Sequence, residues 1–489
     1  MTRFTRRQVV LGGLGLAGTG LLGGCSPASA PGPAHGTRTS FPAQPALSPA
    51  PGRTVVEKTL TAGRATVDLG GPRVETWAYD QLIPGPELRA TAGDLLRITV
   101  DNQLPADTTI HWHGIALHNA ADGVPGMTQA PITPGSRYEY EFLVPDPGTY
   151  FFHPHVGAQL DRGLYAPLIV DDPAEPGGYD AEWVVVLDDW VDGTGRTPDD
   201  VFAALTAGNG SDSGGMGGMD HSGMGDPPFG NAGDVTYPHF LINGRVPATP
   251  ETFQAKPGQR VRLRVINAAS DTIFTVALGG HRLTVTHSDG FGVEPVETDA
   301  FYIGMGERYD VIVALGDGVF PLVAVPFGKD GQALALLRSG SGPAPGASVR
   351  PSEVDGQILQ ASDLRPAQSA RLPQRQPDAS VQVQLSGQMS PYVWAINGAP
   401  FGRNTPLEVS AGQRLQLRVS NRTMMTHPVH VHGHTFALAS GVRKDTVLVR
   451  PMEAITLELQ ADNPGEWMIH CHNIYHAEAG MMIALGYRG

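Results

Sequence analysis

Cysteine and lysine are scarce in this sequence of 489 residues. There are two cysteines, Cys25 and Cys471, and the lysines are Lys58, Lys256, Lys329 and Lys444. The 48 Asp and Glu residues outnumber the 34 Lys and Arg residues, which gives a formal net charge of −14. Such an acidic chain is poorly suited to bind a polyanion, so we expect no nucleic-acid partner. The charge suits a cationic substrate such as a metal ion, and it is equally compatible with solubility alone.

The N-terminal segment 1–25 also lacks a run that would make a comfortable membrane helix, because its apolar stretch is short and rich in glycine. Arg6 and Arg7 precede this stretch and Leu22-Gly23-Gly24-Cys25 ends it, a pattern that resembles a twin-arginine export signal with a lipoprotein cleavage box. We therefore expect export by the twin-arginine route, a lipid on Cys25 that attaches the protein to a membrane, and a place in the cell envelope or periplasm. An uncleaved anchor or a fortuitous basic tail is the alternative. If Cys25 carries lipid, Cys471 has no intrachain partner, and metal ligation would explain a lone thiol.

Helical periodicity is rare along the rest of the chain. Short runs rich in Val, Ile, Leu, Thr, Tyr and Phe alternate with clusters of Gly, Pro, Asn and Asp, which is typical of β-sandwiches. Residues 26–52 are rich in Pro, Ala, Ser and Gly and are predicted to form a poorly ordered tether. The length suggests about three domains, and we expect a monomer.

An internal repeat supports three related domains. Residues 93–102, 258–267 and 412–421 each begin with glycine, end with asparagine and alternate apolar positions between them. We place the domains at 53–172, 173–345 and 381–489, with 346–380 as a linker. Segment 191–235 is rich in Gly, Pro, Ser and Asp and is interpreted as a loop inserted in the second domain.

Most of the 17 histidines gather in four clusters within the first and third copies of the repeat. The clusters are His111-Trp112-His113, His153-Pro154-His155, His427-Pro428-Val429-His430-Val431-His432, and His470-Cys471-His472 followed by His476 and Met481. The matching stretch of the middle copy, near 318–326, has no histidine. We therefore expect the outer domains to hold metal and the middle domain to act mainly as a spacer.

The spacing within the clusters predicts how the ligands are presented. Side chains at i and i+2 of a strand share a face, so each His-x-His pair presents two imidazoles together, and Cys471 points away from His470 and His472. A thiolate, two imidazoles and a weak axial thioether make a blue-copper centre. Cys471, His427, His476 and Met481 supply that set, and eight histidines remain for a three-copper cluster. Zinc is disfavoured, because a structural zinc site closes with four ligands and leaves most of these histidines unexplained.

The four clusters, in this order, resemble the copper-binding motifs of three-domain multicopper oxidases, the family of laccases, bacterial cuprous oxidases and bilirubin oxidases. The resemblance covers nearly all of residues 53–489 and implies an all-β fold of three consecutive cupredoxin-like Greek-key β-sandwich domains. It also implies four copper ions. His427, Cys471 and His476 would bind the type 1 copper with Met481 axial, and His111 and His430 the type 2 copper. The type 3 pair would be held by His113, His153, His155, His432, His470 and His472.

The activity that the resemblance implies is one-electron oxidation of a substrate coupled to four-electron reduction of dioxygen to water, with Cys471 carrying electrons toward His470 and His472. Asp122, eleven residues after His111, matches an acidic position implicated in proton delivery, although Asp122-Gly123 is also an ordinary turn. Bacterial relatives often carry a second acid directly after the last type 1 histidine. Here that residue is Ala477, with Glu478 one position further on, which puts the second proton donor in doubt.

Methionines suggest the substrate. The glycine-rich loop 210–226 contains Met216, Met219, His221 and Met224, soft ligands that could gather Cu(I), and Met425 could stand on the substrate side of the type 1 copper. Such a loop can equally be a flexible linker, and Met424 and Met425 can equally be core residues. We expect a copper-detoxifying cuprous oxidase with some phenol oxidase activity, similar to mycobacterial lipoprotein multicopper oxidases. The rivals are a laccase that oxidises phenols, a copper nitrite reductase, which the eight-histidine cluster disfavours, and a non-catalytic copper-sequestering lipoprotein.

Overall fold

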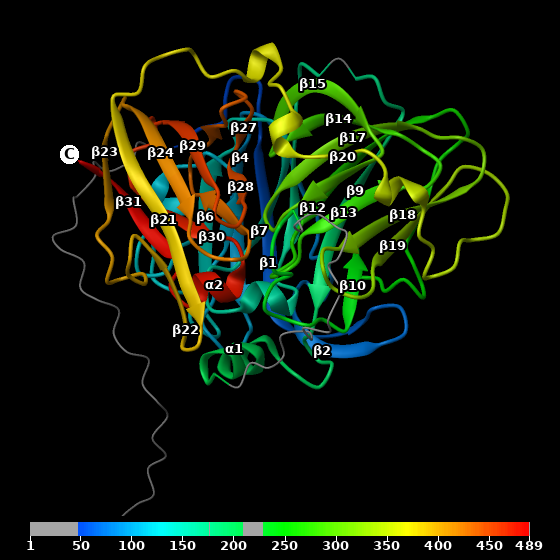
Figure 1. Cartoon of the computed structure of the whole chain (residues 1–489), viewed down its shortest axis with the longest axis horizontal. Helices are drawn as coiled ribbons and strands as arrows, with labels where there is room; N and C mark the ends of the chain where they lie inside the picture. The colour runs from blue at the N-terminus through cyan, green and yellow to red at the C-terminus, as the bar shows by residue number, and fades with distance from the viewer. Residues whose placement is uncertain (1–46, 176, 209–227, 489) are drawn as a thin grey trace, which may run out of the picture. The chain divides into compact units, whose positions relative to one another are not determined.

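The computed structural model describes residues 47–175, 177–208 and 228–488, which belong to one compact unit. The regular secondary structure of the described chain is almost wholly β-strand (Figure 1). The predicted signal 1–25, the tether up to residue 46 and the methionine-rich loop 210–226 lie outside the described residues. Residues 47–52 are described, and the amide of Ala50 donates to the carbonyl of Gly93, 2.9 Å away.

The first domain is formed by strands β1 (Val55–Asp68), β2 (Arg73–Tyr79), β3 (Leu88–Thr91), β4 (Leu95–Asn102), β5 (His111–His113), β6 (Arg137–Leu143), β7 (Gly148–His153) and β8 (Ala166–Asp171). They form one sheet in the order β2-β1-β4-β6 and another in the order β3-β8-β7-β5. The second sheet therefore carries both histidine strands of this domain, β5 and β7, at one edge.

The second domain, green in Figure 1, is formed by β9 (Ala181–Trp190), β10 (His239–Ile242), β11 (Thr252–Gln254), β12 (Arg260–Asn267), β13 (Phe274–Leu278), β14 (Leu283–Ser288), β15 (Phe291–Thr298), β16 (Ala300–Ile303), β17 (Arg308–Ala314), β18 (Val319–Pro326), β19 (Ala333–Arg338) and β20 (Ile358–Leu359). Its sheets have the orders β10-β9-β12-β17-β14-β15 and β11-β19-β18-β13-β16-β20. Strand β20 lies in the predicted linker 346–380 and pairs with β16, so this part of the segment extends the second domain's sheet.

The third domain is formed by β21 (Ala379–Met389), β22 (Tyr392–Ile396), β23 (Leu407–Ser410), β24 (Arg414–Asn421), β25 (His427–Val431), β26 (Phe436–Ala437), β27 (Arg443–Lys444), β28 (Thr446–Val449), β29 (Ala454–Gln460), β30 (Glu466–Cys471) and β31 (Met482–Arg488). Its sheets have the orders β22-β21-β24-β29-β26-β27 and β23-β31-β30-β25-β28. The two histidine strands, β25 and β30, are neighbours inside the second of these sheets.

The sequence repeat corresponds to β4, β12 and β24, which occupy equivalent places. Each pairs in parallel with the first long strand of its domain and antiparallel with a later one. The glycine that opens each copy has a positive φ, +92° at Gly93, +80° at Gly258 and +83° at Gly412, which only glycine adopts easily. The three-fold repeat that the sequence predicts is therefore a repeat of structure.

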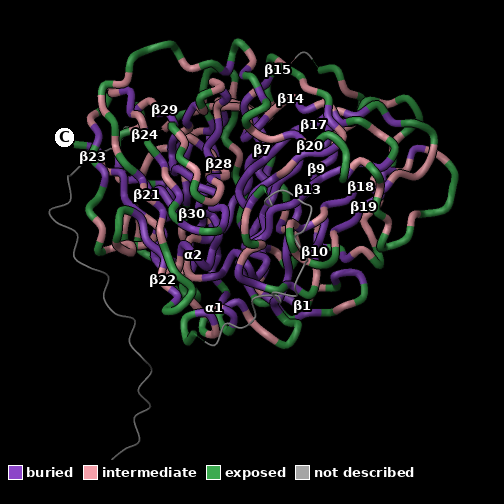
Figure 2. The backbone as a smooth tube through the Cα atoms, viewed as in Figure 1, coloured by how far each residue is buried: buried purple, intermediate pink, exposed green. Residues whose placement is uncertain are grey.

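The asparagine that closes each copy also has the same task. Asn102, Asn267 and Asn421 are buried; in each, the side-chain amide donates to backbone carbonyls of the following loops, and its oxygen accepts the amide two residues ahead. These bonds satisfy buried backbone groups in the loops that, in the outer copies, lead to the histidine strands. Buried residues form a continuous band along the strands of all three domains, and the connecting loops are mostly exposed (Figure 2).

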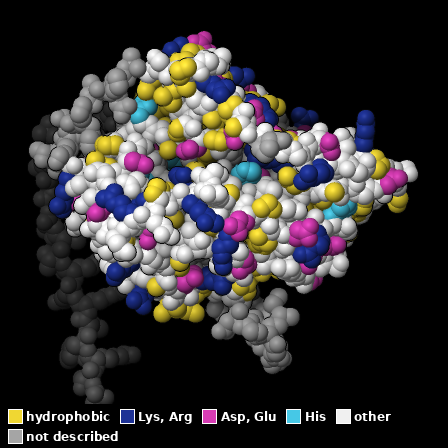
Figure 3. Space-filling view, turned by 90° about the horizontal axis from the view of Figure 1, so that it is seen from above, with side chains coloured by type: hydrophobic (Ala, Val, Ile, Leu, Met, Phe, Trp, Pro, Cys, Tyr) yellow, Lys and Arg dark blue, Asp and Glu magenta, His cyan; other side chains and the backbone are white. Residues whose placement is uncertain are grey.

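Two short α-helices interrupt the β-structure of the described residues. Helix α1 (Pro198–Thr206) lies in the predicted loop 191–235, where Thr197 and Asp200 form a capping box. Helix α2 (Ile474–Glu478) follows β30 and is capped by the side chain of Asn473. In the described residues, no helix is both long and apolar enough to cross a membrane. Basic and acidic side chains are interspersed over the face shown in Figure 3.

Candidate metal centres

Two pairs of neighbouring strands bring the histidine motifs together. In the first domain β5 pairs with β7, so that His111 lies opposite His153. In the third domain β25 pairs with β30, so that His430 lies opposite His470 and Val429 opposite Cys471. Because alternate residues share a face of a strand, His111 and His113 of β5 point to one side. His155, His432 and His472 lie just beyond the ends of β7, β25 and β30, and the chain that follows these strands brings them into the same space.

The eight paired histidines fall into three sets whose ring nitrogens lie within 4.8 Å of one another. The sets are His111 and His430 with His113 beside them; His113, His153 and His472; and His155, His432 and His470. Within them, Nε2 of His111 lies 3.4 Å from Nε2 of His430, and Nε2 of His432 lies 3.0 Å from Nε2 of His470. Each set combines residues from the first and third domains, so both are needed to complete it.

Hydrogen bonds fix which nitrogen of each ring faces the shared space. Four rings place Nδ1 within 2.8–3.0 Å of a backbone carbonyl, namely His111, His153, His430 and His470. An imidazole that donates from Nδ1 presents Nε2 as its ligand atom. His113 is reversed, since its Nε2 lies 3.2 Å from a carboxylate oxygen of Asp445, which leaves Nδ1 for a metal.

Several of these nitrogens are buried without a hydrogen-bond partner in the described part of the chain: Nδ1 of His113, Nε2 of His153 and both ring nitrogens of His472. An unsatisfied buried polar atom costs about 1–3 kcal/mol, and a bound metal ion would satisfy these. Burial, followed by the neighbouring imidazoles, lowers the pKa of His153, His470 and His472 well below the usual value. Neutral imidazoles with free lone pairs are what a metal requires, so the residues fit a cluster of metal ions.

A separate set contains the buried thiol. Sγ of Cys471 lies 3.5 Å from Nδ1 of His427 and 3.6 Å from Nδ1 of His476, and the two Nδ1 atoms are 3.1 Å apart. Metal–ligand bonds of roughly 2.0–2.3 Å that meet at one ion place the ligand atoms at such separations. Met481 is fully buried beside them, and its backbone bonds to Cys471 and His476 close the loop. One thiolate and two imidazoles suit a blue-copper centre.

Asp234, which the sequence analysis missed, supports this thiol site. Its Oδ2 lies 2.9 Å from Nε2 of His476 and accepts a 2.7 Å hydrogen bond from the hydroxyl of Tyr392. Burial alone would lower the pKa of His476, but the charge and hydrogen bond of Asp234 outweigh it and raise the pKa to about 10. The carboxylate therefore orients the ring and makes it a more basic ligand.

Two further carboxylates touch the histidine cluster. Asp122 places its oxygens 3.2 Å from Nδ1 of His111 and 3.0 Å from Nδ1 of His432, so the predicted acid does lie against the cluster. Asp445, which the sequence analysis did not single out, bonds to His113 and receives two hydrogen bonds, of 2.7 and 2.6 Å, from Arg308.

The charge state of Asp445 follows from those contacts. Burial tends to raise its pKa, but the Arg308 guanidinium and the imidazole hydrogen bonds outweigh burial and hold the pKa well below the usual range. Ala477 is buried and cannot donate a proton, whereas burial and the charge of Asp199 raise the pKa of Glu478 to about 7. Asp445 is therefore a second carboxylate adjacent to the cluster, at a position that no local motif indicated.

Methionines lie on the open side of His476. A small cavity of about 10 Å³ is lined by Met305, Met425 and His476, and Met305 is another residue that the sequence analysis missed. Met425 is 6% exposed, whereas Met424 is 66% exposed. The other residues proposed to bind substrate, Met216, Met219, His221 and Met224, lie outside the described residues.

Comparisons with known proteins agree on one family. Three models described as multicopper oxidase match residues 61–175, 182–341 and 374–488. The chain is 47% identical to the multicopper oxidase MmcO of Mycobacterium tuberculosis over 99% of this chain and 97% of that protein. It is 30% identical to a copper resistance protein A homolog of Pseudomonas syringae over 98% of both chains.

Solved structures confirm the fold. A multicopper oxidase from Pseudomonas thermotolerans is 28% identical, with a TM-score of 0.67 over 89% of this chain and 99% of the other. Fet3p, described as a multicopper oxidase that functions in iron import, has a TM-score of 0.76 over 88% of this chain and 90% of the other, and at 21% identity it speaks for the fold alone. The predicted succession of cupredoxin-like domains is confirmed, and the chain belongs to the multicopper oxidases.

Proposed function

We propose that the enzyme holds four copper ions and oxidises Cu(I) to Cu(II) in copper detoxification, with reduction of dioxygen to water. The thiol set of His427, Cys471 and His476 would hold the type 1 copper, with Met481 axial. His111 and His430 would hold the type 2 copper, and the two remaining three-histidine sets the type 3 pair. When bound, copper supplies one-electron chemistry at the thiol site and dioxygen reduction at the histidine cluster.

The chain's own residues then have distinct tasks. Cys471 lies between His470 and His472 in the sequence, so a single peptide segment connects the thiol site with two ligands of the cluster. Asp122 orients His432, and Asp445 orients His113. Asp122 is buried beside the cluster, where it would deliver protons for water formation, whereas Asp445 is paired with Arg308 and stays ionised.

The small cavity beside His476 is the observation that supports Cu(I) as the substrate. It has room for about one water-sized group, so it suits an ion and excludes an aromatic ring. Met305 and Met425 are among its lining residues, and thioethers are soft ligands that favour Cu(I). Asp271 also lines the cavity, but its carboxylate is paired with the ammonium of Lys329 at 2.8 Å, so the assignment rests on the methionines.

The described residues on either side of the methionine-rich loop also support a cuprous substrate. Before the loop, Phe202 of α1 stacks on Tyr475, which precedes His476, with ring centroids 6.5 Å apart. After the loop, Asn231 donates to the carbonyl of Met424, and Gly230 forms a bridge with Met425. The described segments before and after the loop thus contact the surroundings of the thiol site, where methionines that carry Cu(I) would be useful.

Oxygen consumption by the copper-loaded enzyme, supplied with Cu(I) or with a neutral phenol, tests the proposal. We expect Met305→Leu/Met425→Leu to suppress Cu(I) turnover and to spare phenol turnover, because leucine keeps the volume and removes the sulfur. Deletion of residues 213–226 should act in the same direction. Met389→Leu, an exposed methionine on β21, is the control. Unchanged Cu(I) turnover in the double variant and in the deletion would favour the laccase alternative.

The location of the enzyme is a further part of the proposal. The twin-arginine pattern and the cleavage box at Cys25 support export and a lipid anchor in the cell envelope. An enzyme that oxidises Cu(I) there would act before the ion reaches the cytoplasm. We propose that it works as a monomer, since one chain supplies every ligand set.

A further inference from the structure

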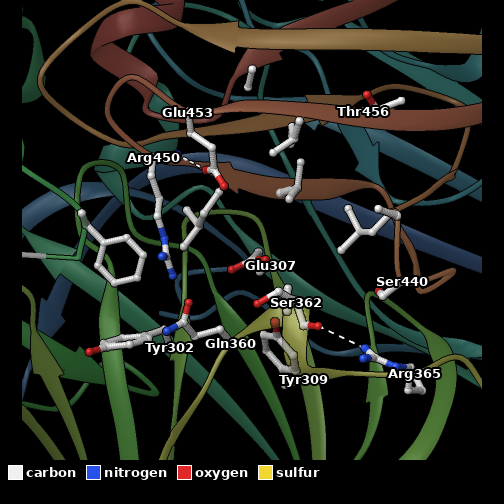
Figure 4. Close-up of a pocket in the computed structure, with 18 residues that line it drawn as sticks. Tyr302, Glu307, Tyr309, Gln360, Ser362, Arg365, Ser440, Arg450, Glu453 and Thr456 are labelled. Carbon is white, nitrogen blue, oxygen red and sulfur yellow. Dashed lines mark hydrogen bonds between the residues drawn. The ribbon is translucent and has the colours of Figure 1, made fainter.

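A second and much larger cavity of about 690 Å³ contains none of the predicted metal ligands. It lies between the second domain, the segment around residues 360–365 and the third domain (Figure 4). Its lining residues include no histidine, cysteine or methionine, so it offers none of the usual ligands of copper. Its volume falls in the range of sites that bind small organic molecules.

Two arginines mark opposite ends of this cavity, Arg450 at one end and Arg365 at the other (Figure 4). Within the described ranges, neither guanidinium pairs with a carboxylate. The guanidinium of Arg450 lies 5.6 Å from the ring centre of Phe229. That of Arg365 bonds only to the backbone carbonyls of Ser362 and Leu364, at 3.2 and 2.7 Å. Each guanidinium group therefore keeps N–H donors that could bind an anion.

The lining of the cavity has an excess of positive charge. Glu307 lies 3.1 Å from the ammonium of Lys444 and accepts a 2.7 Å hydrogen bond from the amide of Gly304, so its charge is compensated. Glu453 accepts a 2.7 Å hydrogen bond from the backbone amide of Arg450 and keeps its charge. Two arginines against this one uncompensated carboxylate favour an anionic ligand.

Ser440 lines the cavity at the same end as Arg365 (Figure 4). Its hydroxyl oxygen is buried away from the cavity space, so the guanidinium of Arg365 is the group at this end that can bind an anion.

The remaining walls indicate what the anion is attached to. Phe229 and Tyr302 stand edge to face at the Arg450 end, with ring centroids 4.8 Å apart, and Leu448 and Ile455 form an apolar wall. Aromatic edges, an arginine plane and aliphatic side chains together suit a flat aromatic ring. The cavity thus combines an apolar slot with a carboxylate-binding end.

We infer that this cavity binds aromatic carboxylates and is the docking site for phenolic acids as electron donors, separate from the small cavity at His476. The inference rests on the proposed function, in that His427 must ligate the type 1 copper. The carbonyl of Phe229 accepts hydrogen bonds from the amide and hydroxyl of Thr426, at 3.2 and 2.9 Å. Thr426 is joined directly to His427, so a short bonded path leads from the cavity wall to the thiol site. Each of four phenolic acids loses one electron and one proton, and one dioxygen takes up all four of each to give two waters.

Binding of benzoate, which lacks an oxidisable hydroxyl, tests the site without turnover. Isothermal titration calorimetry on the copper-loaded enzyme should show saturable binding that Arg365→Gln weakens about tenfold or more, because the charge-assisted hydrogen bond to the carboxylate is lost, and that Arg450→Met weakens less, because only the guanidinium plane beside the aromatic ring is lost. Methionine at 450 keeps the apolar stem against Phe229. Arg350→Gln is the matched control, because Arg350 is exposed, pairs with Asp355 and does not line the cavity. Absence of benzoate binding, equal binding by all variants, or equal competition by sulfate would overturn the inference.

Steady-state kinetics separates the inference from the proposed function. Arg365→Gln should raise KM for a hydroxybenzoate about tenfold, while kcat, Cu(I) turnover and KM for a neutral phenol stay the same. Benzoate should compete with the hydroxybenzoate and leave Cu(I) turnover unchanged. If Cu(I) turnover falls together with hydroxybenzoate turnover, the two sites are not separate and the inference fails. If wild type oxidises hydroxybenzoate and not Cu(I), the proposed function fails and the inference stands.

Discussion

Asp234→Asn is the substitution that most sharply tests how the thiol site is held. The carboxylate bonds to Nε2 of His476 at 2.9 Å and to the Tyr392 hydroxyl at 2.7 Å. A hydrogen bond to a charged group contributes about 1.5–3 kcal/mol and a neutral one about 0.5–1.5 kcal/mol, so a neutral amide loses roughly 1–1.5 kcal/mol at each bond. The two losses correspond to weaker copper binding by a factor of about 30 to 150, close to the about 10- to 100-fold typical of residues that orient a metal ligand.

The assay is competition for copper between the enzyme and a chelator, followed by the visible absorption of the thiolate–copper bond. Asp234→Asn should release this copper at a chelator concentration at least about tenfold lower than wild type requires, while the copper of the histidine cluster is retained. Asp330→Asn is the matched control, because Asp330 is exposed. A difference of less than twofold between Asp234→Asn and wild type would refute the argument that Asp234 strengthens His476 as a ligand.

Three other substitutions test the surroundings of the cluster and the joints between domains. In Gly306→Ala a Cβ would lie 2.9–3.0 Å from two ligand imidazoles. Gly412 is the matched control, because its φ is also +83° and its Cβ would meet nothing within 4 Å. Copper analysis should therefore show loss of cluster copper in Gly306→Ala and full copper in Gly412→Ala. Arg308→Met leaves Asp445 buried without its cation and should lower the free energy of unfolding in urea by about 3–5 kcal/mol, and a loss below about 1 kcal/mol would contradict that. Burial tends to raise the pKa of Asp310, but two buried arginines lower it well below its usual value. The stabilisation that Asp310 contributes is therefore present above about pH 4 and is lost as pH falls. Asp310→Asn should remove this part of the acid dependence of unfolding, and an unchanged dependence would show that it does not come from Asp310.

The ligand residues can be predicted from the sequence because each histidine motif is a local pattern. A His-x-His pair on a strand shares a face whatever surrounds it, so the placement of His111 with His113 follows from strand geometry alone. The three-fold repeat is predictable for the same reason, since a glycine with positive φ and a buried asparagine are local requirements at the two ends of each strand. These features need no knowledge of how the domains meet.

Residues that act across domains could not be predicted in this way. Asp234 and Met305 belong to the second domain, yet they lie against His476 of the third. Asp445 reaches His113 of the first domain and is held by Arg308 of the second. Each is an isolated residue in a loop or at a strand end, and its task arises only from long-range packing, so the middle domain does more than separate the other two.

Local composition also misled the sequence analysis about secondary structure. Segment 191–235 is rich in glycine, proline and aspartate, yet it contains α1, because Thr197 and Asp200 cap the helix and Pro198 suits its first turn. Strand β20 in the predicted linker is only two residues long, Ile358–Leu359, and forms by pairing with β16. A strand that short has no periodicity of its own, so only its partner reveals it.

The ratio of Cu(I) consumed to dioxygen consumed shows whether the enzyme reduces dioxygen to water with electrons from Cu(I). It is measured with an oxygen electrode and a Cu(I)-specific indicator in the same sample, with catalase added afterwards to detect peroxide. We expect four Cu(I) to be consumed per dioxygen and no oxygen to be released on addition of catalase. Two Cu(I) per dioxygen with accumulated peroxide, or no oxygen uptake with Cu(I) at all, would contradict it.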